Sequence, residues 1–99
     1  EDLSAAARAI NLPPVADAGE DRTVDVDEEG KATVLLDGGR SYDPDGDIGG
    51  WAWEDGSGRV IGDTPQVRVR LSDGVHVFHL TVTDDRGASS KSTITVQVR

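Results

Sequence analysis

Three aspartates alternate in the stretch SYDPDGDI, at Asp43, Asp45 and Asp47, just before the only two tryptophans of this 99-residue chain. Carboxylates at this spacing suit a hard cation such as Ca²⁺, which takes about six to eight oxygen ligands. An EF-hand loop starting at Asp43 is excluded, because its sixth position needs glycine and holds Ile48. The same aspartates also suit Asx-turns that cap backbone N–H groups.

The remaining residues with chemical potential do not form a catalytic pattern. Trp51 and Trp53 lie two apart and share one face of a strand, where we expect them to pack in the core. An exposed Trp51 would instead offer a sugar-stacking surface. His76 and His79 are three apart on one strand and point to opposite faces, so they cannot act on one substrate. No nucleophile elbow or phosphate loop is present, and we expect no enzymatic activity.

The composition limits the partners. The chain has 19 acidic and 10 basic residues, a formal charge of -9, and this charge repels phosphate backbones and anionic lipids. We therefore expect no nucleic-acid binding. We also expect no membrane insertion, because no apolar run of about 18 residues is present. Cysteine is absent, which excludes disulfides and thiolate metal sites. The chain begins at Glu1 without a signal stretch, and we expect a monomeric module of a larger protein.

These residues must be positioned by strands, because the hydrophobic pattern beyond Val15 has a period of two. Gly/Asp-rich turns separate the segments. We predict an all-β fold, an immunoglobulin-like antiparallel β-sandwich of about seven strands. Residues 1–11 are expected to form a linker or short helical extension, and residues 12–99 the sandwich. Besides a strand around the tryptophans, the predicted strands are 22–26, 33–37, 66–71, 75–83 and 92–98.

Four segments resemble the PKD domain, an immunoglobulin-like module: NLPPVADAGED, LLDGGRSYDPDGDI, WAW and DGVHVFHLTVTDDRG. The resemblance covers nearly the whole chain from about Asn11 to Val98. The stretch from Trp53 to Gly58 is similar to the bacterial and KIAA-type branch of the family, and the bacterial members are secreted or surface proteins. His76 stands where many members have a tyrosine, and its imidazole can make the same corner hydrogen bond.

The resemblance also implies a calcium site at one end of the sandwich. Leu12 would contribute its backbone carbonyl, whereas Asp47 and Asp85 are expected to face solvent. Carboxylates gathered without a cation would raise one another's pKa values. The implied ligands are Asn11, Leu12, Asp43, Asp45 and Asp84.

The predicted function is that of a non-catalytic accessory module in a larger secreted or cell-surface protein. It would act as a spacer or interaction domain stabilised by Ca²⁺, with neighbouring domains, a protein or a polysaccharide as partners. Two alternatives remain open. One is a carbohydrate-binding module that uses Trp51. The other is an adhesion or self-assembly unit that associates through an edge strand or through the outward face of Arg68 and Arg70.

Overall fold

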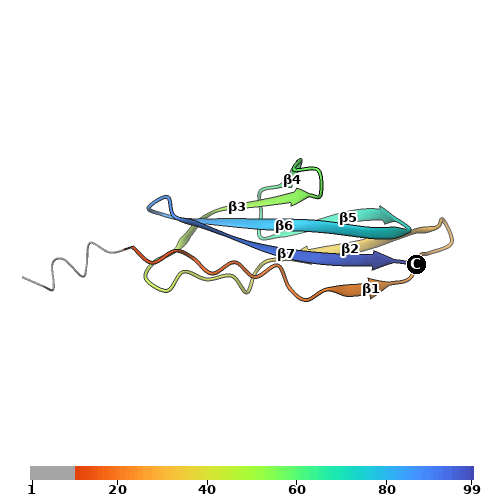
Figure 1. Cartoon of the computed structure of the whole chain (residues 1–99), viewed down its shortest axis with the longest axis horizontal. Helices are drawn as coiled ribbons and strands as arrows, with labels where there is room; N and C mark the ends of the chain where they lie inside the picture. Colours follow the sequence, from red (N-terminus) through yellow and green to blue (C-terminus); the bar gives the residue numbers. More distant parts are fainter. Residues whose placement is uncertain (1–10) are drawn as a thin grey trace, which may run out of the picture.

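The computed structural model describes residues 11–99, which form seven strands in two sheets (Figure 1). The strands are β1 (Arg22–Val24), β2 (Lys31–Asp37), β3 (Ile48–Asp55), β4 (Val60–Gly62), β5 (Gln66–Ser72), β6 (Gly74–Asp84) and β7 (Ser89–Val98). The larger sheet has the order β1-β7-β6-β3-β4, and the smaller sheet contains only β2 and β5. Pairing is antiparallel except between β1 and β7, which are parallel. The predicted immunoglobulin-like β-sandwich is confirmed.

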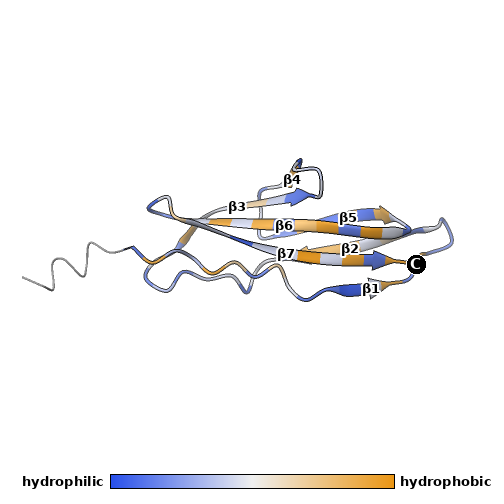
Figure 2. Cartoon of the chain, in the orientation of Figure 1, coloured by the Kyte–Doolittle hydropathy of each residue, from blue (hydrophilic) through white to orange (hydrophobic). Residues whose placement is uncertain are grey.

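The core lies between the two sheets, where the alternating apolar residues meet. Figure 2 shows this alternation along β6 and β7 as bands of apolar and polar residues. Leu36 of the smaller sheet and Trp53 and Leu80 of the larger sheet are fully buried. Burying a leucine of this kind stabilises the fold by about 1.5–3 kcal/mol. The hydrophobic period therefore determines which face of each strand points inward.

The strand boundaries differ from the prediction at a few ends. β1 stops at Val24 rather than Val26, because its register with β7 ends where Val24 lies opposite Val98. The Val26 N–H still donates to the Arg99 carbonyl at 3.1 Å, and Asp27 then starts a turn in which its carboxylate accepts the N–H groups of Glu29 and Lys31. Nearly all of the predicted segment 1–11 lies outside the described residues, so its linker role stays a prediction. None of residues 11–99 forms a helix long and apolar enough to cross a membrane.

Three distant segments meet at one end of the sandwich. β3 and β6 run antiparallel, so Ile48 at the start of β3 lies opposite Asp84 at the end of β6. An isolated bridge between Val15 and Tyr42 holds the N-terminal segment beside the chain that leads into the DPDGD loop. The loop, the end of β6 and the N-terminal segment consequently share one end of the molecule.

Candidate metal centre

The five residues of the implied calcium site come together at this end. The Asn11 side-chain amide donates to Asp84 Oδ2 at 2.7 Å, and the Leu12 N–H donates to Asp45 Oδ2 at 2.8 Å. These contacts join residues 73 and 33 positions apart, so only the folded chain can make them. Leu12 contributes its N–H to the observed contact, while the predicted role of its carbonyl stays a prediction.

Asp84 forms the base of the cluster. It is the only buried charged residue in the described part of the chain, at 4% exposure. Its Oδ1 accepts the N–H groups of Arg86 and Ala88, both at 2.9 Å, in a turn where Gly87 has a φ of 93°. Only glycine adopts such a φ without strain. Asp84 therefore shapes the β6–β7 turn with one oxygen, in agreement with the Asx-turn alternative, and holds Asn11 with the other.

Asp43 is arranged differently. Its Oδ1 accepts the N–H of Asp45 at 3.0 Å, which closes the turn of the DPDGD loop. Its Oδ2 is buried and has no hydrogen-bond partner among residues 11–99. A buried carboxylate oxygen without a partner carries a desolvation cost that a cation would remove.

A third carboxylate, that of Asp85, joins this group. One oxygen each of Asp43, Asp84 and Asp85 lies within 4.8 Å of the others. Asp85 is exposed, as expected, yet its side chain reaches back toward the loop. Strand alternation would send Asp84 and Asp85 to opposite faces, but the turn that starts at Asp84 ends this alternation. The only feature of the sequence that indicated a role for Asp85 in this group is its position directly after Asp84. Asp47 is also exposed, and it is not part of the group.

The pKa values show how unequal the loop carboxylates are. The N–H of Asp45 lowers the pKa of Asp43, but desolvation and the carboxylates of Asp45 and Asp84 outweigh it and leave the pKa raised. The N–H of Leu12 and the carboxyl group of Asp43 lower the pKa of Asp45. Desolvation raises the pKa of Asp84, but the Asn11 amide and the N–H groups of the turn outweigh it, so the pKa is lowered.

The donor set fits a hard divalent cation. All of its charged groups are carboxylates, with one amide side chain beside them, and Ca²⁺ is bound by oxygen ligands of these kinds. The unpartnered Oδ2 of Asp43 supports the same conclusion, because it has repulsive neighbours and no donor. Asp43, Asp84 and Asp85 are the side chains whose oxygens lie close enough together to hold such an ion, and Asn11 contacts this group through its bond to Asp84.

The tryptophans belong mainly to the core. Trp53 is fully buried, and its indole N–H donates to the carbonyl of Pro65 at 3.2 Å. Trp51 is half-buried and packs against the core cluster. Tyr42, at 56% exposure, is the most exposed aromatic side chain of residues 11–99. A flat, fully exposed tryptophan platform is therefore not formed by the described residues.

The two histidines make separate structural contacts. His76 Nε2 lies 2.8 Å from the carbonyl of Ser72, so its imidazole makes the expected corner contact. His79 Nδ1 lies 2.9 Å from Thr93 Oγ1. His79 is half-buried and lies opposite Thr93 of β7 in the ladder. The two imidazoles do not share a site.

Known proteins with similar sequences and structures match almost the whole described chain. The family model of the PKD domain matches residues 11–98. The chain is 37% identical over 98 residues to the dyslexia-associated protein KIAA0319 of Homo sapiens, covering 90% of this chain. It spans only 9% of the length of that relative.

Two solved structures add to this comparison. The PKD1 domain of Vibrio anguillarum Epp aligns with a TM-score of 0.70 and 30% identity, over 91% of this chain and 98% of that chain. A structure of carbohydrate-binding modules from the β-sandwich superfamily aligns with a TM-score of 0.69 and 30% identity. The second match covers 90% of this chain but 35% of the other, so it concerns about a third of that protein.

Proposed function

Because the chain belongs to the PKD domain family, we propose that it is a non-catalytic module of a larger secreted or cell-surface protein, stabilised by calcium at one end. The observation that supports calcium most directly is the buried, unpartnered Oδ2 of Asp43 within a group of three carboxylates. Millimolar extracellular calcium fills even weak sites. Because the ion would bind only the folded state, its binding would raise the free energy of unfolding.

The mechanical role follows from what the site connects. Asn11 and Leu12 contact Asp84 and Asp45, so the N-terminal segment is fixed to two loops of the sandwich. A cation bound by the same carboxylates would hold both loops and their contacts in one geometry. The junction with a preceding domain would then be stiffer in calcium than without it. The module would thus space and orient neighbouring domains and act as a monomer.

Thermal unfolding tests this function. The protein is chelated exhaustively and melted with and without calcium, in parallel with Asp43→Ala and Asp84→Ala. Calcium at ten times its Kd raises the free energy of unfolding by about 1.4 kcal/mol, which is roughly 5–10 °C in Tm for this size. Both substitutions should abolish the gain. Asp47→Ala is the matched control, since Asp47 lies in the same loop but outside the group, and it should keep the gain.

The outcomes are distinct. If calcium leaves the Tm of the unmodified chain unchanged, the aspartates are turn formers and the calcium function is wrong. If Asp47→Ala loses the gain as fully as Asp43→Ala, the ion binds elsewhere in the loop. An equal gain in all four proteins would mean that calcium acts at another place.

Polysaccharide binding is the second candidate, and the structural similarity to carbohydrate-binding modules favours it. Trp51, half-buried at the surface of the larger sheet, would be the aromatic contact. Soluble polysaccharides should then change the tryptophan fluorescence of the chain but not that of Trp51→Ala. Identical fluorescence with and without polysaccharide would remove this candidate.

A further inference from the structure

The smaller sheet leaves one edge of β5 uncovered. This sheet has only two strands, so β2 covers one side of β5, and no strand among residues 11–99 covers the other. An uncovered edge presents backbone N–H and C=O groups that can pair with another chain. The feature is independent of the calcium site.

The hydrogen bonds identify which backbone groups are free. The Gly38 N–H donates to the Pro65 carbonyl at 2.8 Å, so odd-numbered residues of β5 face β2 and even-numbered residues face away. Thr64 Oγ1 donates to the outward carbonyl of Gln66 at 2.6 Å. His76 occupies the outward carbonyl of Ser72, which lies 2.8 Å from its Nε2. The outward carbonyl at each end of the edge is therefore occupied.

Arg68 and Arg70 remain in the middle of this edge. No group of residues 11–99 bonds to their outward backbone N–H and C=O groups. Two consecutive outward residues offer up to four main-chain hydrogen bonds to an added strand. These two residues thus form a short free stretch between the occupied carbonyls of Gln66 and Ser72.

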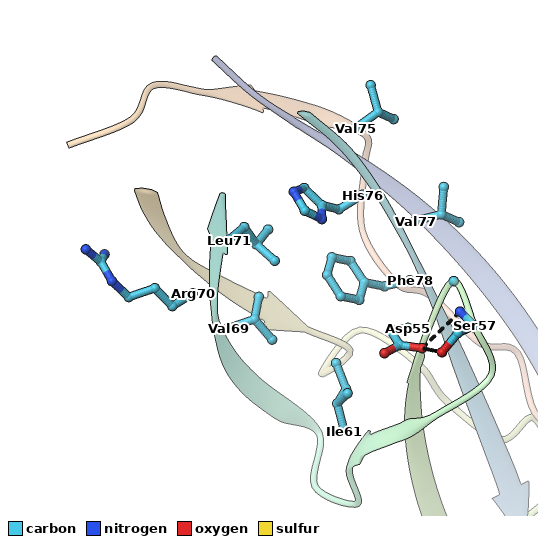
Figure 3. Close-up of a pocket in the computed structure, with 11 residues that line it drawn as sticks. Asp55, Ser57, Ile61, Val69, Arg70, Leu71, Val75, His76, Val77 and Phe78 are labelled. Carbon is cyan, nitrogen blue, oxygen red and sulfur yellow. Dashed lines mark hydrogen bonds between the residues drawn. The ribbon is translucent and has the colours of Figure 1, made fainter. Parts of the chain in front are cut away.

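A cavity of about 540 Å³ lies beside the same edge (Figure 3). Its apolar lining includes Ile61, Val69, Leu71 and Phe78, which come from β4, β5 and β6. Figure 3 shows Val69, Leu71 and Phe78 pointing into the space between the strands. A strand added to β5 would direct every second side chain into this cavity, because side chains alternate between the two faces of a sheet.

The outer face of β5 has the opposite character. Arg68 and Arg70 are exposed there, while Val67 and Val69 point inward. Arg70 is paired with Asp27 at 2.9 Å and with Glu29 at 3.0 Å. Arg68 has no ion pair within the described residues, so its guanidinium is available to an acidic group of a partner.

We propose that the free edge of β5 and the adjoining cavity form a docking site for an extended segment of a partner protein, with acidic side chains on one face and apolar side chains on the other. Main-chain hydrogen bonds at Arg68 and Arg70 provide affinity, and the cavity selects the apolar side chains. A second copy of β5 does not fit, because antiparallel pairing would place these arginines opposite each other. Like charges directly opposite are destabilising.

The probe is a capped synthetic peptide, Glu-Val-Glu-Val-Glu-Val-Glu, titrated into isotope-labelled protein and followed by NMR. We expect chemical-shift changes at the amides of Arg68 and Arg70 and at Phe78 in the cavity. Amide hydrogen exchange at both arginines should slow. The matching Lys-Val peptide should bind at least about tenfold more weakly than the Glu-Val peptide, because its lysine side chains would be repelled by Arg68.

Two variants test the edge and the charge separately. Arg68→Pro removes one outward N–H and no bond to β2, so it should weaken the Glu-Val peptide while the fold is kept. Arg68→Glu leaves the backbone intact and should weaken that peptide roughly fivefold or more. Lys31→Glu, the same charge change on β2, should leave binding within about twofold.

Three results would overturn the proposal. The first is that the Glu-Val peptide at millimolar concentration causes no chemical-shift changes, or causes them only on another surface. The second is that the Lys-Val peptide binds with the same affinity, and the third is that Arg68→Glu binds the Glu-Val peptide as tightly as the unmodified protein does. Concentration-dependent shifts of the β5 amides without any peptide would also reject it, since they would make a second copy the occupant.

Discussion

Asp43 and Asp84 lie in one cluster but contribute to stability with opposite sign. The pKa of Asp84 is lowered from its ordinary value of 3.8, so its contribution is present above that pH and is lost as the pH falls through the folded pKa. The pKa of Asp43 is raised, so its contribution is favourable below 3.8 and is lost as the pH rises through the folded pKa. At neutral pH without a cation, the ionised form of Asp43 is therefore less favourable for folding than the protonated form would be.

Asp43→Asn should stabilise the chelated protein at neutral pH. Asparagine can still accept the Asp45 N–H through its Oδ1, while the repulsion with Asp45 and Asp84 disappears. We expect the Tm without calcium to rise by roughly 2–4 °C, and the response to calcium to be lost. Thermal melts of the chelated protein at pH 7 measure this directly.

Asp84→Asn is the matched comparison and should have the opposite effect. The Oδ1 of Asp84 accepts two N–H groups and its Oδ2 accepts the Asn11 amide, so an amide group cannot replace both oxygens. The Tm without calcium should fall by about 5 °C or more. Equal changes in the two variants would contradict the asymmetry between these carboxylates.

The strands were predictable because each has one buried face. Alternation places Val67, Val69 and Leu71 of β5 inward, and the turn residues between segments are mostly glycine and aspartate. The exact strand ends were less predictable. β1 is shorter than its hydrophobic pattern because its register with β7 ends at Val98, and a strand's own residues do not show where its partner ends.

The candidate site was predictable in its residues but not in its contacts. The family resemblance pointed to the loop aspartates and to Asp84, and the structure brings them to one end of the sandwich. The N–H contact of Leu12 and the position of Asp85 depend on the turn geometry at the strand ends. Turn geometry of this kind is not encoded by hydrophobic periodicity, so the sequence pattern could not provide it.

The turn after β2 is closely packed at Gly38. A Cβ placed there would contact the Leu80 side chain and lie 3.3 Å from the Trp53 ring. Gly38→Ala should therefore lower the free energy of unfolding by about 1–3 kcal/mol through overpacking. Chemical denaturation of the variant and of the unmodified protein would measure this loss of stability, provided that the two m-values agree.

Gly50→Ala is the control for this prediction. Its Cβ would lie 3.9 Å from Thr83 Cβ, an ordinary contact distance, so it should change stability by less than about 1 kcal/mol. If Gly38→Ala were as stable as Gly50→Ala, the packing between this turn and the core would be looser than the structure shows.

The two ends of the sandwich differ in chemistry. One end gathers carboxylates and holds the N-terminal segment at Asn11 and Leu12. Toward the other end, a cavity lined by both apolar and polar side chains adjoins the free edge of β5. A net charge of -9 favours cations at the first end. We therefore predict that calcium acts on the junction with a preceding domain and leaves the β5 edge unchanged.

Amide hydrogen exchange at Leu12, with calcium and after chelation, tests the central claim most directly. The Leu12 N–H bonds to Asp45 Oδ2, so it reports whether the ion holds the N-terminal segment. We predict that calcium slows exchange at Leu12 by about tenfold or more, whereas the outward amide of Arg68 is unaffected. Exchange at Leu12 that stays the same while calcium is bound would contradict the claim that the ion ties this segment to the sandwich.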